Sequence, residues 1–186
     1  FIINSLKLED VIINTKNSNV NNFMDFFSNE LSKSKINLYR TKLIYSDIND
    51  ETILIIPVKK ITFNYNEENN YNILSATGKL FNQPFDLVFK KLISQSEETN
   101  ILFTLKNVNF KFENKQYLNI KELVGKNDLT LGKKQFHTKY SISEDELLFS
   151  SEKKSTKIEN FKYKGKINLK PFDFNINTKT QKLKIN

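Results

Sequence analysis

Apolar and polar side chains alternate over most of the chain that follows Ile36. Runs of this kind include Ile61, Phe63 and Tyr65, and also Phe85, Leu87 and Phe89. A period of two residues is that of a β-strand with one buried face. Short polar stretches, such as residues 66–70 and 94–100, separate the runs and predict turns. The pattern therefore predicts a mainly β fold, with a dozen or so strands in an antiparallel meander.

One segment near the N-terminus has a different period. Val20, Phe23, Phe27 and Leu31 recur at helical spacing, after a polar stretch rich in helix-capping residues. This spacing predicts one α-helix near residues 20–33. We expect its aromatic stripe to pack against the rest of the protein, because such stripes are more often packing surfaces than cofactor sites.

A ten-residue block occurs twice. Residues 78–87 read GKLFNQPFDL and residues 165–174 read GKINLKPFDF, with Gly, Lys, Pro, Phe and Asp at the same offsets. Each proline marks a turn, a strand start or a sheet edge, and each glycine permits a bulge or bend. We therefore expect related strand–turn–strand hairpins at 78–89 and 165–176, with Pro84 and Pro171 at equivalent places. The alternative is an ordinary hairpin that recurred by chance.

The repeat also bears on domain organisation. We expect residues 1–186 to be a single β-rich domain, or a segment of a longer array of repeats. No Pro- or Gly-rich linker marks a boundary within the chain.

Few residues suit catalysis. The chain has no cysteine and one histidine, which excludes disulfides, cysteine-zinc sites and thiol nucleophiles and leaves little room for a catalytic triad. His137 lies in an alternating run, where a single histidine is most often exposed or hydrogen-bonded. The carboxylates cluster in predicted turns, and none of the clusters has the spacing of a calcium loop. We therefore expect a non-enzymatic protein with no cofactor and no metal.

The formal net charge is +8, which raises the question of nucleic acid. However, Arg40 is the only arginine, and the lysines are scattered along predicted strands. Arginine supplies most bidentate contacts to bases and phosphates, so we expect no nucleic-acid partner. Attraction to anionic surfaces, including lipid head groups, remains open. No run approaches the roughly 18 apolar residues that predict a membrane-spanning helix.

Several segments resemble the AsmA-like family of bacterial envelope proteins. They are Ile36-Asn-Leu38 followed by Leu43-Ile-Tyr-Ser-Asp47, then Ile61-Thr-Phe63, then Gly78-Lys-Leu80 leading to Gln83-Pro-Phe85, and the second block at 165–174. The resemblance covers residues 36–92 and 156–178, and its motifs are degenerate. The transmembrane anchor typical of the family is not found in this chain.

The resemblance implies an elongated, curved antiparallel sheet with an apolar groove that binds or conducts phospholipid and supports outer-membrane biogenesis. It also implies a place on the periplasmic side of the cell envelope, with a tether to the inner membrane supplied by a segment not present here. Partners would be phospholipid or a membrane surface, and other envelope proteins. The candidate groove residues are Ile61, Phe63, Phe85, Leu87, Phe89, Phe110, Phe112, Phe172, Phe174 and Ile176.

An alternative function remains for the same residues. They could form the closed core of a structural or adhesive β-domain, sandwich-like, that binds partners without lipid cargo. An open apolar groove favours the first function, and two sheets closed over one core favour the second.

Overall fold

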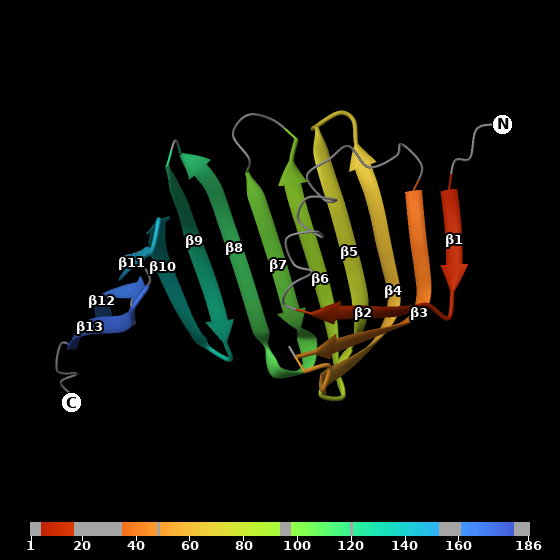
Figure 1. Ribbon diagram of the computed structural model, residues 1–186, viewed down its shortest axis with the longest axis horizontal. Coiled ribbons are helices and arrows are strands. Elements are labelled where there is room, and N and C mark those ends of the chain that lie inside the picture. Colours follow the sequence, from red (N-terminus) through yellow and green to blue (C-terminus); the bar gives the residue numbers. More distant parts are fainter. Residues whose placement is uncertain are drawn as a thin grey trace.

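The computed structural model describes residues 5–16, 35–47, 49–93, 98–119, 121–152 and 161–180. These residues form one large, open and curved β-sheet of 13 strands (Figure 1). The strands are β1 (Ser5–Glu9), β2 (Ile12–Lys16), β3 (Lys35–Ser46), β4 (Thr52–Asn66), β5 (Tyr71–Leu80), β6 (Gln83–Leu92), β7 (Thr99–Leu105), β8 (Phe110–Asn119), β9 (Glu122–Leu131), β10 (Lys134–Ser143), β11 (Glu146–Ser151), β12 (Phe161–Leu169) and β13 (Phe172–Thr180). The predicted mainly β fold is confirmed.

The strands follow one another across the sheet in chain order. From β3 to β13 each strand pairs antiparallel with the next, while β1 and β2 both pair parallel with β3. The predicted antiparallel meander therefore holds from β3 onwards, and the parallel N-terminal edge was not expected. A short 3-10 turn, η2 (Lys106–Val108), connects β7 to β8. The helix predicted near residues 20–33 lies outside the described residues.

Side chains of directly paired residues lie on the same side of a sheet, so the register traces each face across the strands. One row of paired residues runs without a break from β3 to β11, and we call it the central row. Its members are Ile36, Phe63, Leu74, Phe89, Ile101, Asn114, Asn127, Thr138 and Ser151. We call the face that carries this row the inner face, and the opposite one the outer face.

The N-terminal strands bend sharply and fold over the part of the inner face that lies nearest to them. Asp10 and Arg40 have positive φ angles of 57° and 51°, and neither Arg40 nor Lys59 has a partner in the register of β3 with β4. Lys59 is one extra residue in β4, because Val58 pairs with Gly78 and Lys60 pairs with the adjacent Thr77. The alternation of faces shifts at Arg40 and at Lys59, which keeps Leu38, Val58 and Ile61 buried while the strands bend. Beyond the bend lie β2, residues 41–46 of β3 and residues 52–58 of β4, which we call the flap. In Figure 1 β2 crosses the sheet while β1 runs along it.

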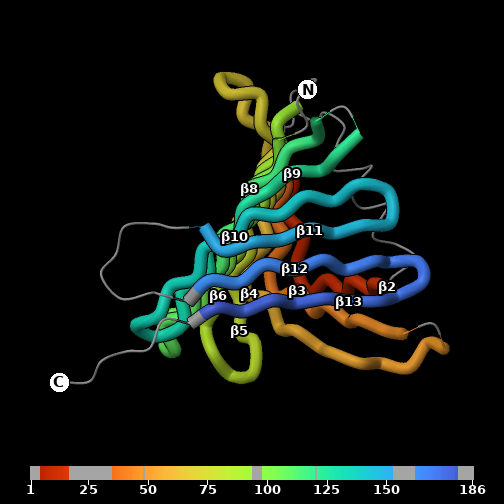
Figure 2. Tube along the Cα trace, turned by 90° about the vertical axis from the view of Figure 1, so that its left-hand side faces the viewer, coloured from red at the N-terminus to blue at the C-terminus, as the bar shows by residue number. Residues whose placement is uncertain are grey.

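The flap makes the N-terminal part of the molecule two layers deep. The buried core consists of Leu38, Val58, Ile61, Leu74, Ala76, Phe85 and Phe89. Ile13, Leu43 and Ile56 of the flap pack against it. Burial of a large apolar side chain contributes about 1.5–3 kcal/mol, so this core is the main source of stability among the described residues. The side view shows β10–β13 one above another at the near end of the sheet (Figure 2).

Three glycines on the inner face each lie opposite an aromatic residue. Gly78 pairs with Phe85, Gly125 with Tyr140, and Gly165 with Phe149. A Cβ atom added to Gly125 would lie 2.3 Å from the ring of Tyr140, and one added to Gly165 would lie 2.3 Å from the ring of Phe149. The rings thus occupy the space above the glycines. Glycine at such positions lets a sheet curve toward its inner face.

The repeated block forms two hairpins that differ in register. Residues 78–87 span β5 and β6, and residues 165–174 span β12 and β13. Gly78 pairs with Phe85, but Gly165 pairs with Ile176 rather than with Phe172. Pro84 lies within β6, opposite Lys79, whereas Pro171 lies in the turn before β13. The expected equivalence of the two prolines is therefore wrong, because the second turn lies two residues later in the block.

Candidate inner-face site

All ten predicted groove residues lie on the inner face. Ile61 shares a row with Leu87 and Phe112, through the pairs of β4 to β8. Phe63 and Phe89 belong to the central row, and Phe85 shares the next row with Phe110. At the far edge, Phe172, Phe174 and Ile176 pair with the inner-face residues Leu169, Ile167 and Gly165. Their common face was predictable from period two alone.

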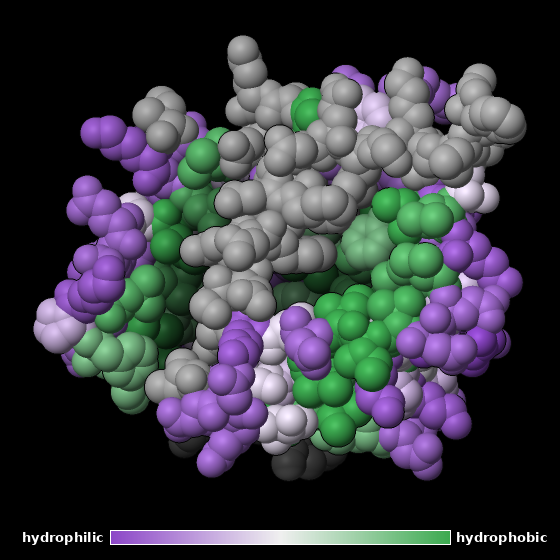
Figure 3. All heavy atoms as spheres, turned by 45° about the vertical axis from the view of Figure 1, so that its right-hand side comes forward, coloured by the Kyte–Doolittle hydropathy of each residue, from purple (hydrophilic) through white to green (hydrophobic). Residues whose placement is uncertain are grey.

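The ten residues differ sharply in exposure. Ile61, Phe85 and Phe89 retain 4–8% of their accessible surface, whereas Phe172, Phe174 and Ile176 retain 73%, 61% and 51%. The first group belongs to the core beneath the flap, and the second lies on the edge hairpin β12–β13. The space-filling view shows apolar side chains gathered in the hollow of the sheet, with polar ones around its rim (Figure 3). The inner face is thus closed at one end and open at the other.

A set of hydrogen-bonding side chains, which sequence analysis did not single out, lies in the open part of the inner face. We call it the polar ladder, and its members are Asn114, Gln116, Asn127, Thr138, Tyr140, Ser151 and Tyr163. The Asn114 carboxamide donates to Asn127 Oδ1 at 2.8 Å and to the Tyr140 hydroxyl at 2.6 Å. The Tyr140 hydroxyl in turn donates to Gln116 Oε1 at 2.8 Å. Strands β8, β9 and β10 are joined by these contacts.

The ladder continues into β11 and β12. The hydroxyls of Thr138 and Tyr163 share a hydrogen bond, and the Tyr163 backbone N–H donates to Ser151 Oγ at 3.2 Å. Burial raises the pKa of the Tyr140 phenol, and the hydrogen bond from Asn114 opposes that shift. All members of the ladder have uncharged side chains, and Asn114 Oδ1 is a buried acceptor without a hydrogen bond.

Apolar side chains flank the ladder on both sides. The row on one side contains Phe103, Phe112, Leu129 and Phe136. The row on the other side contains Leu118, Leu123, Ile142, Leu147, Ile167 and Phe174. Neighbouring rows are roughly 7 Å apart, the distance covered by two residues of a strand. This part of the inner face can therefore contact an amphiphile, with apolar surface on each side of a hydrogen-bonding strip.

Ion pairs lie on the outer face. Glu113 pairs with Lys111 and Lys115, and Glu152 pairs with Lys126 and Lys139. The hydrogen bond from Lys115 lowers the pKa of Glu113, and that from Lys139 lowers the pKa of Glu152. These carboxylates offset the repulsion among Lys115, Lys126 and Lys139, which lie directly opposite one another on adjacent strands. His137 is also paired, with Nδ1 2.5 Å from Asp128 Oδ1.

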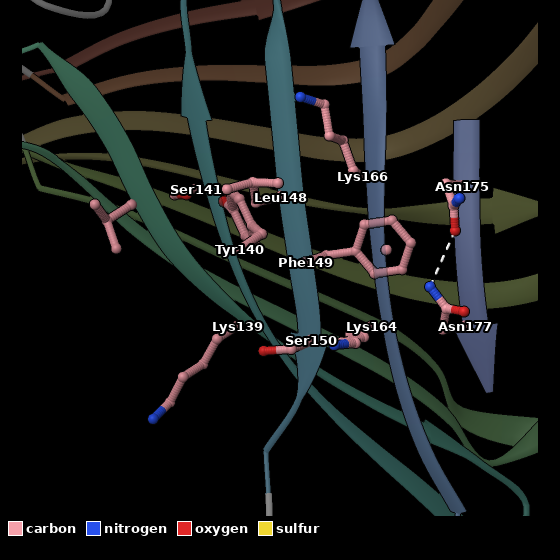
Figure 4. Close-up of a pocket in the computed structure, with 12 residues that line it drawn as sticks. Lys139, Tyr140, Ser141, Leu148, Phe149, Ser150, Lys164, Lys166, Asn175 and Asn177 are labelled. Carbon is pink, nitrogen blue, oxygen red and sulfur yellow. Dashed lines mark hydrogen bonds between the residues drawn. The ribbon is translucent and has the colours of Figure 1, made fainter. Parts of the chain in front are cut away.

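A shallow depression of about 630 Å³ lies on the outer face of β10–β13 (Figure 4). Lysine, serine and asparagine side chains make up much of its lining, and Asn177 donates to Asn175 Oδ1 at 3.0 Å beside it. Lys162, Lys164 and Lys166 alternate along β12 on this face, while the exposed aromatic residues Phe172 and Phe174 lie on the inner face. A protein that binds nucleic acid by stacking bases on aromatic rings would need its lysines and its exposed aromatic residues on the same face. On the hairpin β12–β13, the lysines and the exposed aromatic side chains therefore lie on opposite faces.

Among the described residues, no group of three or more histidine, cysteine or acidic side chains could hold a metal ion. The same residues contain no helix with the length and apolar character to cross a membrane. Comparison of the chain with protein-family models, curated proteins and solved structures gives no match.

Proposed function

We propose that this chain is a non-enzymatic lipid-binding module that holds acyl chains against the open part of its inner face. The observation that carries the proposal is the exposure of Phe172, Phe174 and Ile176, which extend the apolar inner face beyond the core. Large exposed apolar patches on soluble proteins commonly mark surfaces that contact another molecule or a membrane. The resemblance to AsmA-like proteins supports an acyl chain of a phospholipid as that molecule.

The dimensions of the open part suit an acyl chain. The six strands β8 to β13 are spaced about 4.8 Å apart, so they span roughly 24 Å across the sheet. One acyl chain occupies about half of the roughly 30 Å hydrocarbon core of a bilayer, which is about 15 Å. Each methylene group removed from water contributes about 0.8 kcal/mol. Contact of an acyl chain with a row of apolar side chains therefore contributes favourably to binding.

The wider role follows from the same resemblance. The chain would be a curved-sheet segment of an AsmA-like protein on the periplasmic side of a bacterial envelope, tethered to the inner membrane by another segment. There it would conduct phospholipid along its inner face and support outer-membrane biogenesis. Its partners would be phospholipid, a membrane surface and envelope proteins.

Native mass spectrometry of the chain purified from bacteria tests the proposal. The wild type should carry phospholipid, and Phe174→Asp should lose it without a change in thermal midpoint, because an exposed position can hydrate the new carboxylate. Asn175→Asp is the matched control, since it adds the same charge to the outer face of the same strand. Retention of lipid by Phe174→Asp, or its equal loss in both variants, would contradict the proposal.

A second function is favoured by a separate observation. The flap closes the inner face over β4–β7, as the second layer of a structural β-domain would. If the wild type carries no lipid, a structural or adhesive domain without cargo is the better account.

A further inference from the structure

The polar ladder is placed where an apolar row would be expected. Across β3–β7 the central row is Ile36, Phe63, Leu74, Phe89 and Ile101. Across β8–β11 the same row is Asn114, Asn127, Thr138 and Ser151. A groove for acyl chains alone gains nothing from this change, because amides and hydroxyls bind hydrocarbon less well than Leu or Phe does. The partly exposed members of the ladder, Thr138, Tyr140, Ser151 and Tyr163, can instead offer hydrogen bonds to a polar group in the ligand.

The chemistry of that group follows from the charges. Among the described inner-face positions of β8–β13, Lys134 at the start of β10 is the one charged side chain. A phosphate or sulfate head group is best bound by Arg or Lys, and a cationic one by carboxylates or an aromatic cage. The lysines of β12 lie on the outer face instead. The members of the ladder are uncharged, so the ladder itself offers no ion pair to either kind of head group. The nearest inner-face charge in its rows is Lys91 of β6, which is buried and lies two strands from Gln116.

The ladder does suit a neutral group with many hydroxyls. Its amides and hydroxyls each donate and accept, which matches sugar hydroxyls that do both. The ring of Tyr163, a ladder member, and that of the neighbouring Phe149 have centroids 6.4 Å apart and can contact the C–H face of a sugar ring. Apolar rows on both sides leave room for an attached alkyl chain.

We propose that the open inner face selects an amphiphile with an uncharged glycosyl head group, bound by the polar ladder, over one with an anionic head group. This selectivity rests on the proposed lipid-binding function: phospholipid binds through its acyl chains alone, and an amphiphile with a glycosyl head group adds hydrogen bonds to the polar ladder. The hydroxyls of Thr138 and Tyr163 are the most informative members, because both side chains are partly exposed and hydrogen-bond to each other. Replacing both removes the two hydroxyls that share this hydrogen bond, so that neither is left without the other.

The test measures binding of octyl glucoside and octyl phosphate, each below its micelle-forming concentration, by NMR titration of the full chain. The two probes share a chain and differ in the head group. We expect the glucoside to bind about tenfold more tightly, the equivalent of about 1.4 kcal/mol. Thr138→Val/Tyr163→Phe should abolish that preference while leaving the affinity for octyl phosphate within about twofold, which is under 0.5 kcal/mol.

The control variant is Thr130→Val/Tyr117→Phe, which makes the same two changes on the outer face. It should leave both affinities unchanged. Equal affinity for the two probes, tighter binding of the phosphate, or an unchanged preference in the inner-face variant would overturn the head-group assignment while the lipid-binding function stands. If neither probe binds, lipid binding itself fails.

Discussion

The two ends of the inner face share one sheet and one continuous register but differ in what covers them. Over β3–β7 the flap packs against the sheet, and the central row consists of large apolar residues such as Phe63 and Phe89. Over β8–β11 the same row carries Asn114 and Thr138. The central row of the covered end is wholly apolar, which fits the cost of burying polar side chains away from water.

Polar residues are nevertheless buried beside the central row of the covered end, since Asn72, Lys91 and Thr99 occupy the next row. At the other end Asn114 is buried, whereas Thr138 and Tyr140 are partly exposed and can contact another molecule.

The most direct test of this comparison replaces one phenylalanine by alanine at each end of the inner face. Phe85→Ala should lower the free energy of unfolding by about 3–5 kcal/mol, since it leaves a cavity in the core. Phe174→Ala should lower it by less than about 1 kcal/mol, because its side chain is already 61% exposed. Chemical denaturation followed by circular dichroism measures both. Similar losses in the two variants would show that the ends are packed alike.

A second pair of variants compares the glycines of the two ends. A Cβ on Gly78 would lie 2.5 Å from the Pro57 carbonyl oxygen and 2.9 Å from the Val58 Cα, so the backbone of the bend must move. The three atoms nearest to a Cβ on Gly125 all belong to the Tyr140 side chain, which can move at the cost of its hydrogen bonds with Asn114 and Gln116. We expect Gly78→Ala to cost about 2–3 kcal/mol and Gly125→Ala about 1 kcal/mol. Gly132→Ala is no control here, because Gly132 has a positive φ of 60°.

The midpoints of chemical denaturation of the two variants measure both stability costs. A larger cost at Gly125 than at Gly78 would mean that the open end is the more rigidly packed of the two, contrary to the comparison.

The smallest expected effect concerns the bend that makes the flap possible. Arg40 donates to both carboxylate oxygens of Asp10 at 2.8 Å, and this pairing lowers the pKa of Asp10. Because the folded-state pKa is depressed, the stabilisation is present above the ordinary aspartate pKa of about 3.9 and is lost as the pH falls through the folded value. All of these groups are exposed, so the effect on stability should be small.

NMR titration of Arg40→Met should therefore show the pKa of Asp10 rising to its ordinary value. The pKa of Glu113, held low by Lys115 in the other half of the molecule, should not change. Amide exchange at Lys42, which donates to the Val11 carbonyl at 2.8 Å beyond the bend, should become faster. An unchanged exchange rate would show that the flap does not depend on this pairing.

Much of the sheet could be predicted from period two alone. The alternation of Phe85, Leu87 and Phe89, and that of Phe172, Phe174 and Ile176, placed both sets on one face, and the register confirms it. The bend was missed, although the sequence holds a signal. Apolar positions change phase between Leu8 and Val11, and again between Val58 and Ile61, as expected for one extra residue in each strand.

Neither the exposure of the candidate groove residues nor the polar ladder could be predicted from the local sequence pattern. Phe85 and Phe172 occupy matching places in the repeated block, yet one is buried and the other is exposed, because only the first lies beneath the flap. Asn114 and Gln116 continue the alternation of Phe110 and Phe112, which places them on the inner face. Their hydrogen bonds with Asn127 and Tyr140 depend on how the strands pair, which a single sequence does not show.

Photolabelling with a diazirine-bearing fatty acid, mapped by peptide mass spectrometry, tests the central claim most directly. The account predicts saturable labelling at the open end, on the peptides that contain Phe172, Phe174, Ile176 and Leu147, and its displacement by unlabelled lipid. Peptides that contain Ile61, Phe85 and Phe89 should stay unlabelled, because the flap covers these side chains. Labelling centred on Ile61, Phe85 and Phe89, or spread equally over both ends, would contradict the account.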